Sequence, residues 1–379
     1  MKLETFAFRE TKGWSIPRFP DLDSDRTLVT IFGAPQFLDD PEVLPALLAA
    51  YPLAHIIGCS TSGEIFDTAV NDDTISVAVC RFDDTTLRSI AVPIGGAGQS
   101  REAGRQVGRA LVSPGLRSIL IMSDGLGVNG SEFLEGLNEV VPESVVVTGG
   151  LAGDGDRFKR TWVVHRDGAA TGYISAVGFY GDRLHVGHGS KGGWDVFGPE
   201  RVVTRSVGNV VYEIDGRPSL ALYKEYLGDR AAGLPGTALL FPLALRASRT
   251  DDKSLVRTIL SVDEGAQSMT FAGDVPQGGL VRLMRANFDR LIQGASEAAR
   301  LTRAGSADGQ DSLAIAISCV GRRLVLGQRS EEEVEAAKEA LPTGAHLVGF
   351  YSYGEISPFA TGHCDLHNQT MTLTQIEER

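Results

Sequence analysis

Runs of apolar residues that end in glycine alternate with amphipathic stretches along much of the chain. The first set has the run LVTIFG at 28–33, a segment with apolar positions three and four residues apart at 40–52, and a second run, AHIIG, at 54–58. Continuous apolar runs of this length are typical of strands buried on both faces, and the wider spacing is typical of a helix. The pattern predicts a strand, a helix and a strand.

The same order of elements occurs twice more, in the segments 118–125, 130–142 and 144–155 and in the segments 312–321, 330–342 and 345–356. In every copy a glycine ends each of the two strands, and the two glycines are 24 to 28 residues apart. A parallel pair of strands needs a crossover of a dozen or more residues, usually a helix, and each interval supplies one. We therefore predict three degenerate copies of one unit, with chance similarity among common units as the alternative.

The region between the second and third copies is predicted to be mostly β. Short apolar runs separated by Gly, Pro and Asp extend from about 184 to 275, and segments of helical periodicity lie at 218–228 and 279–305. We predict a mixed α/β protein (α+β) with layered sheets and two closely packed domains. Since no Pro/Ser-rich linker separates the halves, we expect the domains to pack closely, and the softest boundary lies near 210–216.

Composition narrows the possible partners and the compartment. The 379 residues carry a formal net charge of -12, which disfavours nucleic acid and anionic membranes because both repel an acidic surface. No apolar stretch approaches the length of a membrane span, and the first residues are charged at close intervals. The four cysteines are far apart and form no C-x-x-C motif. We expect a cytoplasmic protein with free thiols, no membrane partner and no nucleic-acid partner.

Two copies share a longer pattern, HIIGCSTSGEIF at 55–66 and HLVGFYSYGEIS at 346–357. Each places small residues and then a Glu beyond a buried strand, at the sheet edge where ligands bind in open α/β folds. If the two turns face each other, the carboxylates could bind an ammonium group or an ordered water. The predicted ligand-binding residues are Gly58, Ser60, Gly63, Glu64, Ser352, Gly354 and Glu355. The structural alternative is that the glycines permit tight turns and each Glu caps backbone N–H groups.

Five motifs, in chain order, resemble those of FIST proteins. They are VVVTGGLAGDG, VYEIDGRPSLALYKEYLG, MTFAGDVPQG, GFYSYGEISPF and HNQTMTL. The resemblance runs from about residue 26 to the end and implies a FIST N-terminal sensory domain over 26–210 and a FIST C-terminal domain over 211–379, after an extension at 1–25. It implies a sensory input module for bacterial signal transduction that binds a small ligand.

A subset of this family binds haem to sense nitric oxide and regulates histidine kinases or cyclic-di-GMP enzymes. The resemblance therefore suggests haem b as a cofactor and one of these enzymes as a separate partner, because the chain has no kinase or EAL-type motif. His188 is the candidate axial ligand and metal ligand, with Trp194 and Phe197 near it in sequence to flank a porphyrin. The alternative is a hydrogen-bonded loop histidine.

An enzyme with an unrecognised hydrolase-like site is a further alternative. Ser123 and Asp124 end a predicted strand, and Asp154 and Asp156 could hold a divalent cation. However, the chain has no G-x-S-x-G and no H-E-x-x-H motif, and Asp-Gly pairs form turns. We therefore expect a small-ligand sensor that is not an enzyme. Its ligand is either nitric oxide bound through haem or, without haem, an amino acid or other small polar metabolite.

Overall fold

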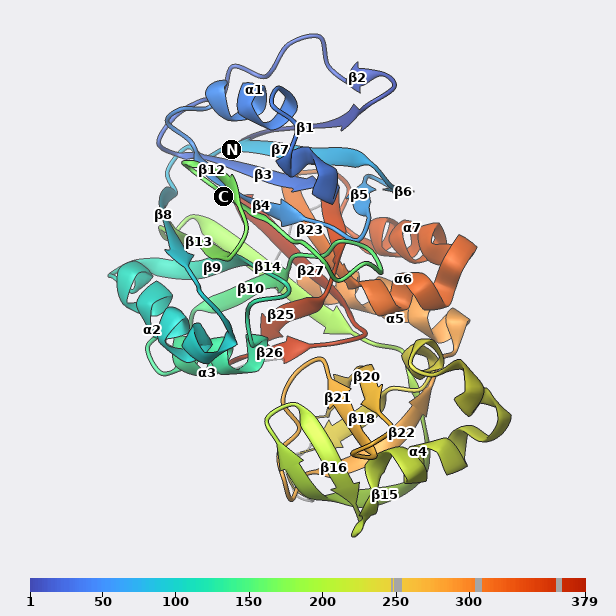
Figure 1. The fold of residues 1–379 in the computed structure, drawn as a ribbon. Helices are drawn as coiled ribbons and strands as arrows, with labels where there is room; N and C mark the ends of the chain where they lie inside the picture. Colours follow the sequence, from blue (N-terminus) through green and yellow to red (C-terminus); the bar gives the residue numbers. More distant parts are fainter. Residues whose placement is uncertain (247, 249–253, 304–308, 359–362) are drawn as a thin grey trace.

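A large body and a smaller lobe make up the protein (Figure 1). The structure is a computed structural model that describes residues 1–246, 248, 254–303, 309–358 and 363–379. Within these residues, three sheets form the body from both ends of the chain, and a fourth forms the lobe from residues 195–285. The predicted class, a mixed α/β protein with layered sheets and two closely packed domains, is confirmed.

Each body sheet is built from strands that are far apart in the sequence. The first runs β12 (Gly168–Ala170), β11 (Val163–His165), β4 (His55–Ser60), β3 (Thr27–Gly33), β7 (Thr74–Arg81), β1 (Lys2–Arg9) and β2 (Gly13–Trp14). The second runs β26 (Cys364–His367), β25 (Gly354–Pro358), β10 (Val146–Leu151), β9 (Leu116–Ser123), β13 (Tyr173–Tyr180) and β8 (Thr86–Pro93). The third runs β14 (Leu184–Lys191), β27 (Met371–Glu378), β23 (Ser312–Cys319), β24 (Ala345–Ser352), β5 (Glu64–Phe66) and β6 (Ala69–Asn71).

The three predicted copies are confirmed, one at the centre of each body sheet. Strands β3 and β4, β9 and β10, and β23 and β24 are parallel neighbours. Their crossovers contain α1 (Val43–Ala49), α3 (Gly130–Asn138), and α6 (Val320–Leu326) with α7 (Ser330–Ala340). The second strand of each copy carries a glycine where a Cβ would lie 1.9 Å from the carbonyl oxygen of the first strand, at Gly58, Gly149 and Gly349. Close approach of the two backbones therefore requires glycine here.

Each copy also gives a strand to the sheet of another copy. After β4, the chain forms β5, which pairs with β24 of the third copy. After β24 it forms β25, which pairs with β10 of the second copy, and after β10 it forms β11, which pairs with β4 of the first. The exchange is cyclic, so the body has the topology of a pseudo-threefold assembly.

The three sheets enclose one apolar core, and helices cover their outer faces (Figure 1). Phe32 of the first sheet stacks on Phe350 of the third, with ring centroids 4.8 Å apart, and Met122 of the second belongs to the same cluster. The outer faces pack against α1, against α2 (Ser100–Leu111) with α3, and against α5 (Phe288–Thr302) with α7. This arrangement explains why the central strands read as continuous apolar runs.

In its described residues, the lobe is an antiparallel sheet with one α-helix, α4 (Ser219–Leu227), and two short 3-10 helices, η3 (Gly228–Gly233) and η4 (Gly236–Leu240). Its strands run β19 (Leu255–Arg257), β18 (Leu243–Arg246), β22 (Leu280–Arg285), β15 (Asp195–Val207), β16 (Val210–Ile214), β21 (Ser268–Phe271) and β20 (Ile259–Asp263), and β17 (Arg217–Pro218) pairs with β16. Two short segments join lobe and body, residues 192–194 before β15 and residues 286–287 after β22. Gly193 has φ +92°, and a Cβ there would lie 2.1 Å from the Arg290 carbonyl oxygen, so only glycine fits this connection.

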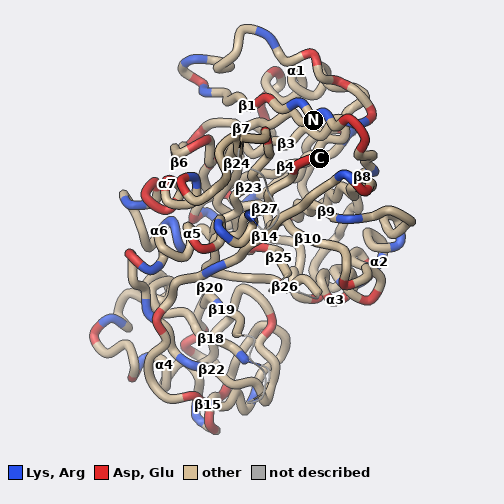
Figure 2. The backbone as a smooth tube through the Cα atoms, turned by 180° about the vertical axis from the view of Figure 1, so that it is seen from behind, with Lys and Arg blue, Asp and Glu red and all other residues tan. Residues whose placement is uncertain are grey.

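Charged residues of both signs lie mainly on helices and loops around the outside of the molecule (Figure 2). The central strands of the body carry few of them. Among the described helices, none combines the length and the apolar character that crossing a membrane requires.

Candidate functional site

The two Gly-Glu turns have the same hydrogen-bonding pattern. Glu64 Oε1 accepts a bond from the Thr61 hydroxyl, and its Oε2 accepts bonds from the Thr74 backbone N–H (3.0 Å) and hydroxyl (2.7 Å). Glu355 Oε1 accepts a bond from the Ser352 hydroxyl (3.0 Å), and its Oε2 accepts bonds from the Thr370 N–H (3.1 Å) and hydroxyl (2.8 Å). Each carboxylate therefore links its own turn to the start of a neighbouring strand, β7 or β27.

These two carboxyl groups are buried but do not share a binding partner. Their exposed fractions are 1% for Glu64 and 0% for Glu355, and burial raises the pKa of Glu64 to about 7 and that of Glu355 to about 8. They lie on different sheets, in β5 and β25. Their contacts match the structural interpretation, in which each Glu fixes its turn.

The other residues predicted at these turns also have structural contacts. Ser60 accepts a hydrogen bond from the Trp162 N–H (3.0 Å), and Gly63 has φ +128° beside the Arg323 guanidinium. Gly354 packs against Leu366. None of the seven predicted ligand-binding residues lines the large cavity described below. Their assignment to a ligand stays a prediction.

His188 lies in the middle of β14, opposite Thr374 of β27. Burial lowers its pKa, and its Nδ1 has no hydrogen-bond partner among the described residues. On the opposite face of the strand, a Cβ at Gly187 or Gly189 would lie 2.0 or 2.1 Å from a carbonyl oxygen of α5, so that face is closed by the helix.

The surroundings of His188 do not fit a porphyrin. Trp194 lies at the seam between body and lobe, where its Nε1–H donates to the Gln369 carbonyl (2.8 Å). Phe197 packs near Phe241 in the lobe. Neither aromatic residue flanks the histidine, and His188 does not line the large cavity. Haem binding therefore stays a prediction.

The residues of the hydrolase alternative act as turn formers. The Asp154 carboxylate accepts hydrogen bonds from three backbone N–H groups at 158–160 and from the Tyr353 hydroxyl. Asp124 accepts bonds from two backbone N–H groups of its own turn and from the Thr161 hydroxyl (2.9 Å). Within the described ranges, no group of three or more His, Cys, Asp or Glu side chains is arranged to hold a metal ion.

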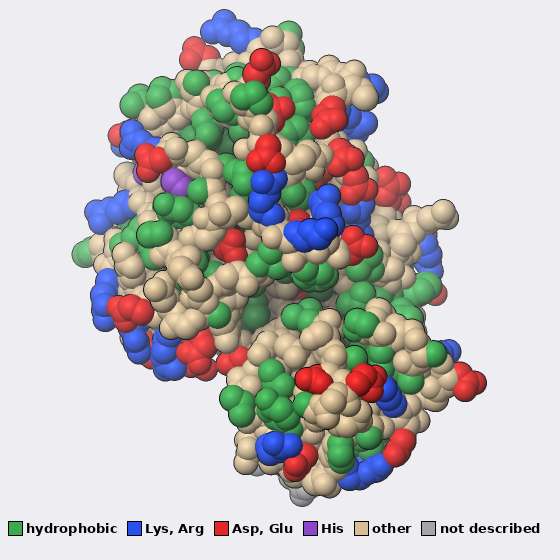
Figure 3. Space-filling view, in the orientation of Figure 1, with side chains coloured by type: hydrophobic (Ala, Val, Ile, Leu, Met, Phe, Trp, Pro, Cys, Tyr) green, Lys and Arg blue, Asp and Glu red, His purple; other side chains and the backbone are tan. Residues whose placement is uncertain are grey.

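A cavity of about 600 Å³ lies at the seam between body and lobe. Figure 3 shows a hollow there, bordered by hydrophobic side chains. The body contributes Ala97, Gly125, Leu126, Val128, Asn129, Gly130, Leu151, Asp156, Phe158, Cys319, Val320, Gly321, Leu324, Tyr353, Leu366 and Asn368, and the lobe contributes Asn209, Pro235, Gly236, Leu239, Thr258, Ile259, Leu260, Phe271, Ala272 and Gly273. A largely apolar cleft of this size between two structural units is typical of small-molecule sites.

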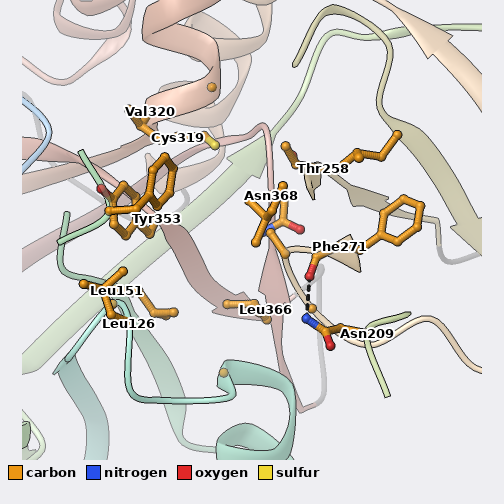
Figure 4. Close-up of a pocket in the computed structure, with 18 of the residues that line it drawn as sticks. Leu126, Leu151, Asn209, Thr258, Phe271, Cys319, Val320, Tyr353, Leu366 and Asn368 are labelled. Atoms are coloured by element: carbon orange, nitrogen blue, oxygen red, sulfur yellow. Dashed lines mark hydrogen bonds between the residues drawn. The ribbon is translucent and has the colours of Figure 1, made fainter. Parts of the chain in front are cut away.

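One wall of the cavity comes from the body and the other from the lobe (Figure 4). Tyr353, Leu126 and Leu151 lie on one side in this view, Thr258 and Phe271 lie on the other, and Asn368 lies between them. Tyr353 is held in place because its ring stacks on Phe158, with centroids 4.6 Å apart, and its hydroxyl donates to the Gly155 carbonyl (3.0 Å). The body wall therefore presents a fixed aromatic surface.

Two buried polar atoms in the cavity wall have no hydrogen-bond partner among the described residues, Thr258 Oγ1 and Asn368 Oδ1. The side chains are 3% and 1% exposed. Asn368 Nδ2 donates to the His367 carbonyl (3.0 Å), which leaves Oδ1 as the free acceptor. Buried polar groups are nearly always hydrogen-bonded in native proteins, so unpaired atoms beside a cavity point to a missing ligand or water.

The turn at 368–370 connects this cavity to the body–lobe junction. Asn368 lines the cavity, the Gln369 carbonyl accepts bonds from Trp194 Nε1 and Arg322 Nη1, and Thr370 binds Glu355. Gln369 has φ +61°, a left-handed conformation that is unusual for a residue other than glycine and that these contacts hold in place. A change at the cavity wall therefore acts on a backbone that also holds the junction.

Sequence reasoning missed this cavity. Asn368 lies within the HNQTMTL motif, which supported a family resemblance but suggested no role for the residue. The signal that could have drawn attention to it is an Asn followed by Gln and Thr directly before a buried strand, since polar residues there are either caps or site residues.

The similarity of this chain to known proteins identifies its family but not its ligand. A solved structure, that of cyanuric acid hydrolase from A. caulinodans, is 12% identical over 78% of this chain and 99% of that chain, but its TM-score of 0.19 is too low to support an argument. The comparison with curated proteins gave no match. The FIST N domain matches residues 27–217 and the FIST C domain matches residues 219–358. The chain therefore belongs to the FIST family, whose domains are associated with the sensing of small ligands in signal transduction.

Proposed function

We propose that this chain is a ligand sensor whose site is the cavity between body and lobe. The observation that carries the proposal is that one cavity of about 600 Å³ is lined by both units and has two buried, unpaired polar atoms in its wall. A ligand there contacts body and lobe together. Its affinity depends on their relative position, so binding shifts the population towards the position that it fits best.

The route from the cavity to the junction supports this proposal. Arg322 is fully buried and donates to the carbonyls of Gly192, in the first connection between body and lobe, of Leu291, in the first turn of α5 after the second connection, and of Gln369. Because Gln369 follows Asn368 directly, a ligand that contacts Asn368 acts on a turn that is bonded to Arg322, and through it to the first connection and to the start of α5. The output is a change in the lobe's position.

The signal leaves through a separate protein. The sequence contains no recognisable kinase or cyclic-di-GMP enzyme motif, so a partner of that kind, a histidine kinase or a cyclic-di-GMP enzyme, would read the position of the lobe. A partner that responds to ligand must contact both units or the lobe alone. Loss of the lobe's response would therefore uncouple ligand binding from output without abolishing binding.

Binding of Nile red, an uncharged fluorescent dye, tests the cavity. Leu126 and Leu324 line it and are 42% and 49% exposed, so replacing both with Trp fills the cavity with little disturbance of the core. The matched control places Trp at Leu53 and Leu301, which are 57% and 49% exposed and lie outside the cavity. We expect saturable binding by the wild type and the control and at least tenfold weaker binding by L126W/L324W. Equal affinity in all three proteins would overturn the proposal.

A distance measurement tests the response of the lobe. The four native cysteines are buried, so nitroxide labels can be attached to cysteines at two exposed positions, Val112 in the body and Val207 in the lobe. Saturation with Nile red should shift or narrow the distance distribution measured by pulsed electron paramagnetic resonance. An unchanged distribution at full occupancy would contradict transmission by the lobe.

A further inference from the structure

We infer that the ligand of this cavity is an uncharged, largely apolar molecule that carries an N–H or O–H hydrogen-bond donor, such as an aromatic amide. The inference rests on the proposed function and concerns the chemistry of the same site. Three features of the cavity carry it: the apolar wall, the absence of basic side chains from the lining, and the buried acceptor at Asn368.

The wall selects for apolar surface. Apolar side chains with exposed surface line it, among them Leu126, Leu324 and Phe158 of the body and Leu260 of the lobe, which are 42% to 50% exposed. The ring of Tyr353 is fixed by its stacking on Phe158 and offers a flat face. A planar apolar group of the ligand can pack there without ordering further side chains, so binding retains most of the benefit of removing apolar surface from water.

The charges around the cavity exclude an anion. No Lys, Arg or His is among its lining residues in the described part of the chain, and the one ionisable carboxylate there, Asp156, is exposed at the rim. The nearby Arg257 is buried behind Gly273, and its guanidinium donates to the carbonyls of Asp274 and Leu366. An anionic ligand would lose its hydration without gaining a cationic partner. The same reasoning disfavours the carboxylate of a free amino acid.

The unpaired acceptor fixes the polar end of the ligand. Because Asn368 Nδ2 already donates to the His367 carbonyl, Oδ1 is the atom without a partner, and it can only accept. A ligand donor therefore completes it. Thr258 Oγ1, the second unpaired atom, can donate or accept, so a group with a donor and an acceptor side by side, as in a primary amide, suits the pair.

The test compares two probes of similar shape, naphthalene-2-acetamide, which is uncharged and has N–H donors, and naphthalene-2-acetate, which is anionic and has none. Affinities are measured by displacement of Nile red at pH 7.5 and checked by calorimetry. We expect the amide to bind at least tenfold more tightly than the carboxylate. A carboxylate that binds equally or more tightly overturns this inference and leaves the cavity as the sensory site.

Two variants assign the preference to the polar atoms. Asn368→Leu removes the acceptor. Thr258→Val keeps the shape of the side chain and removes only its hydroxyl, so it serves as the folded variant if Asn368→Leu is unstable. We expect each to reduce the affinity for the amide at least fivefold more than it reduces the affinity for Nile red. Unchanged amide affinity in both variants overturns the inference. If the wild type binds neither Nile red nor the amide, the proposed function is overturned instead.

Discussion

Removing the guanidinium of Arg322 should destabilise the whole molecule. Arg322 and Glu333 are both 0% exposed, with Nη2 and Nε of the arginine 2.7 and 3.0 Å from the same carboxylate oxygen. Replacing the arginine by Met leaves Glu333 buried without its partner, which costs about 3–5 kcal/mol for a buried ion pair. The substitution also removes donors from buried carbonyls at Gly192, Leu291 and Gln369, each worth roughly 1 kcal/mol.

The expected loss in the free energy of unfolding is therefore about 6–8 kcal/mol, a large part of the ~5–15 kcal/mol that stabilises a typical protein. Urea unfolding followed by tryptophan fluorescence measures it. The control is Arg329→Met, because the Arg329–Glu332 pair has a similar N–O distance of 2.8 Å but is 38% and 48% exposed. We expect this change to cost no more than ~1 kcal/mol, since solvent screens surface pairs.

A double-mutant cycle separates the pair from the other contacts. If Glu333 is also replaced, by Met, the uncompensated charge disappears, so the double variant should be at least ~2 kcal/mol more stable than the sum of the single effects predicts. A loss below ~1.5 kcal/mol for Arg322→Met alone would refute the reasoning. It would mean that water reaches Glu333 when the arginine is absent, and that the junction does not depend on this group.

Three further predictions follow from single residues. Burial raises the pKa of Glu355 from 4.5 to about 8, so the folded state binds its proton more tightly than the unfolded state does. The free energy of unfolding should therefore fall as pH rises from about 4.5 through 8. The urea midpoint of Glu355→Gln should vary less than that of the wild type over that range. Gly349→Ala should cost more than ~3 kcal/mol, because its Cβ would lie 1.9 Å from the Ala316 carbonyl oxygen, whereas Gly98→Ala, with open space around it, should cost less than ~0.5 kcal/mol in the same assay. Trp194→Phe removes one buried hydrogen bond at the body–lobe junction and should lower the free energy of unfolding by ~1 kcal/mol. It should also speed amide hydrogen exchange in residues 192–195, and unchanged exchange would contradict the role of Trp194 in holding the junction.

Much of the body could be predicted from the sequence because its information is local. The three copies read as strand, helix and strand since each strand is buried on both faces and each helix covers one sheet. The exchange of β5, β11 and β25 between sheets could not be predicted in this way. Those strands have only three to five residues each, too few for their pattern to identify the partner.

The candidate site depends on information that is not local. The Gly-Glu turns stand out in the sequence because duplicated units retain similar turns, but the partners of the carboxylates, Thr74 and Thr370, lie 10 and 15 residues beyond them. The cavity is assembled from loops on both sides of the body–lobe seam. Asn368 becomes notable only when its side chain is seen buried beside that cavity with its oxygen unpaired.

The cyclic exchange of strands means that neither half of the protein is a complete folding unit. A fragment that ended near residue 217 would contain β5 without β24, the strand that it pairs with, and its central core would lack the third sheet. During synthesis, β5 must therefore wait for β24, at residues 345–352, before it is paired in the third sheet. Proteolytic loss of β27, which pairs with β14 and β23, would open the same core, so the proposed sensing by this fold depends on strands that are far apart in the sequence.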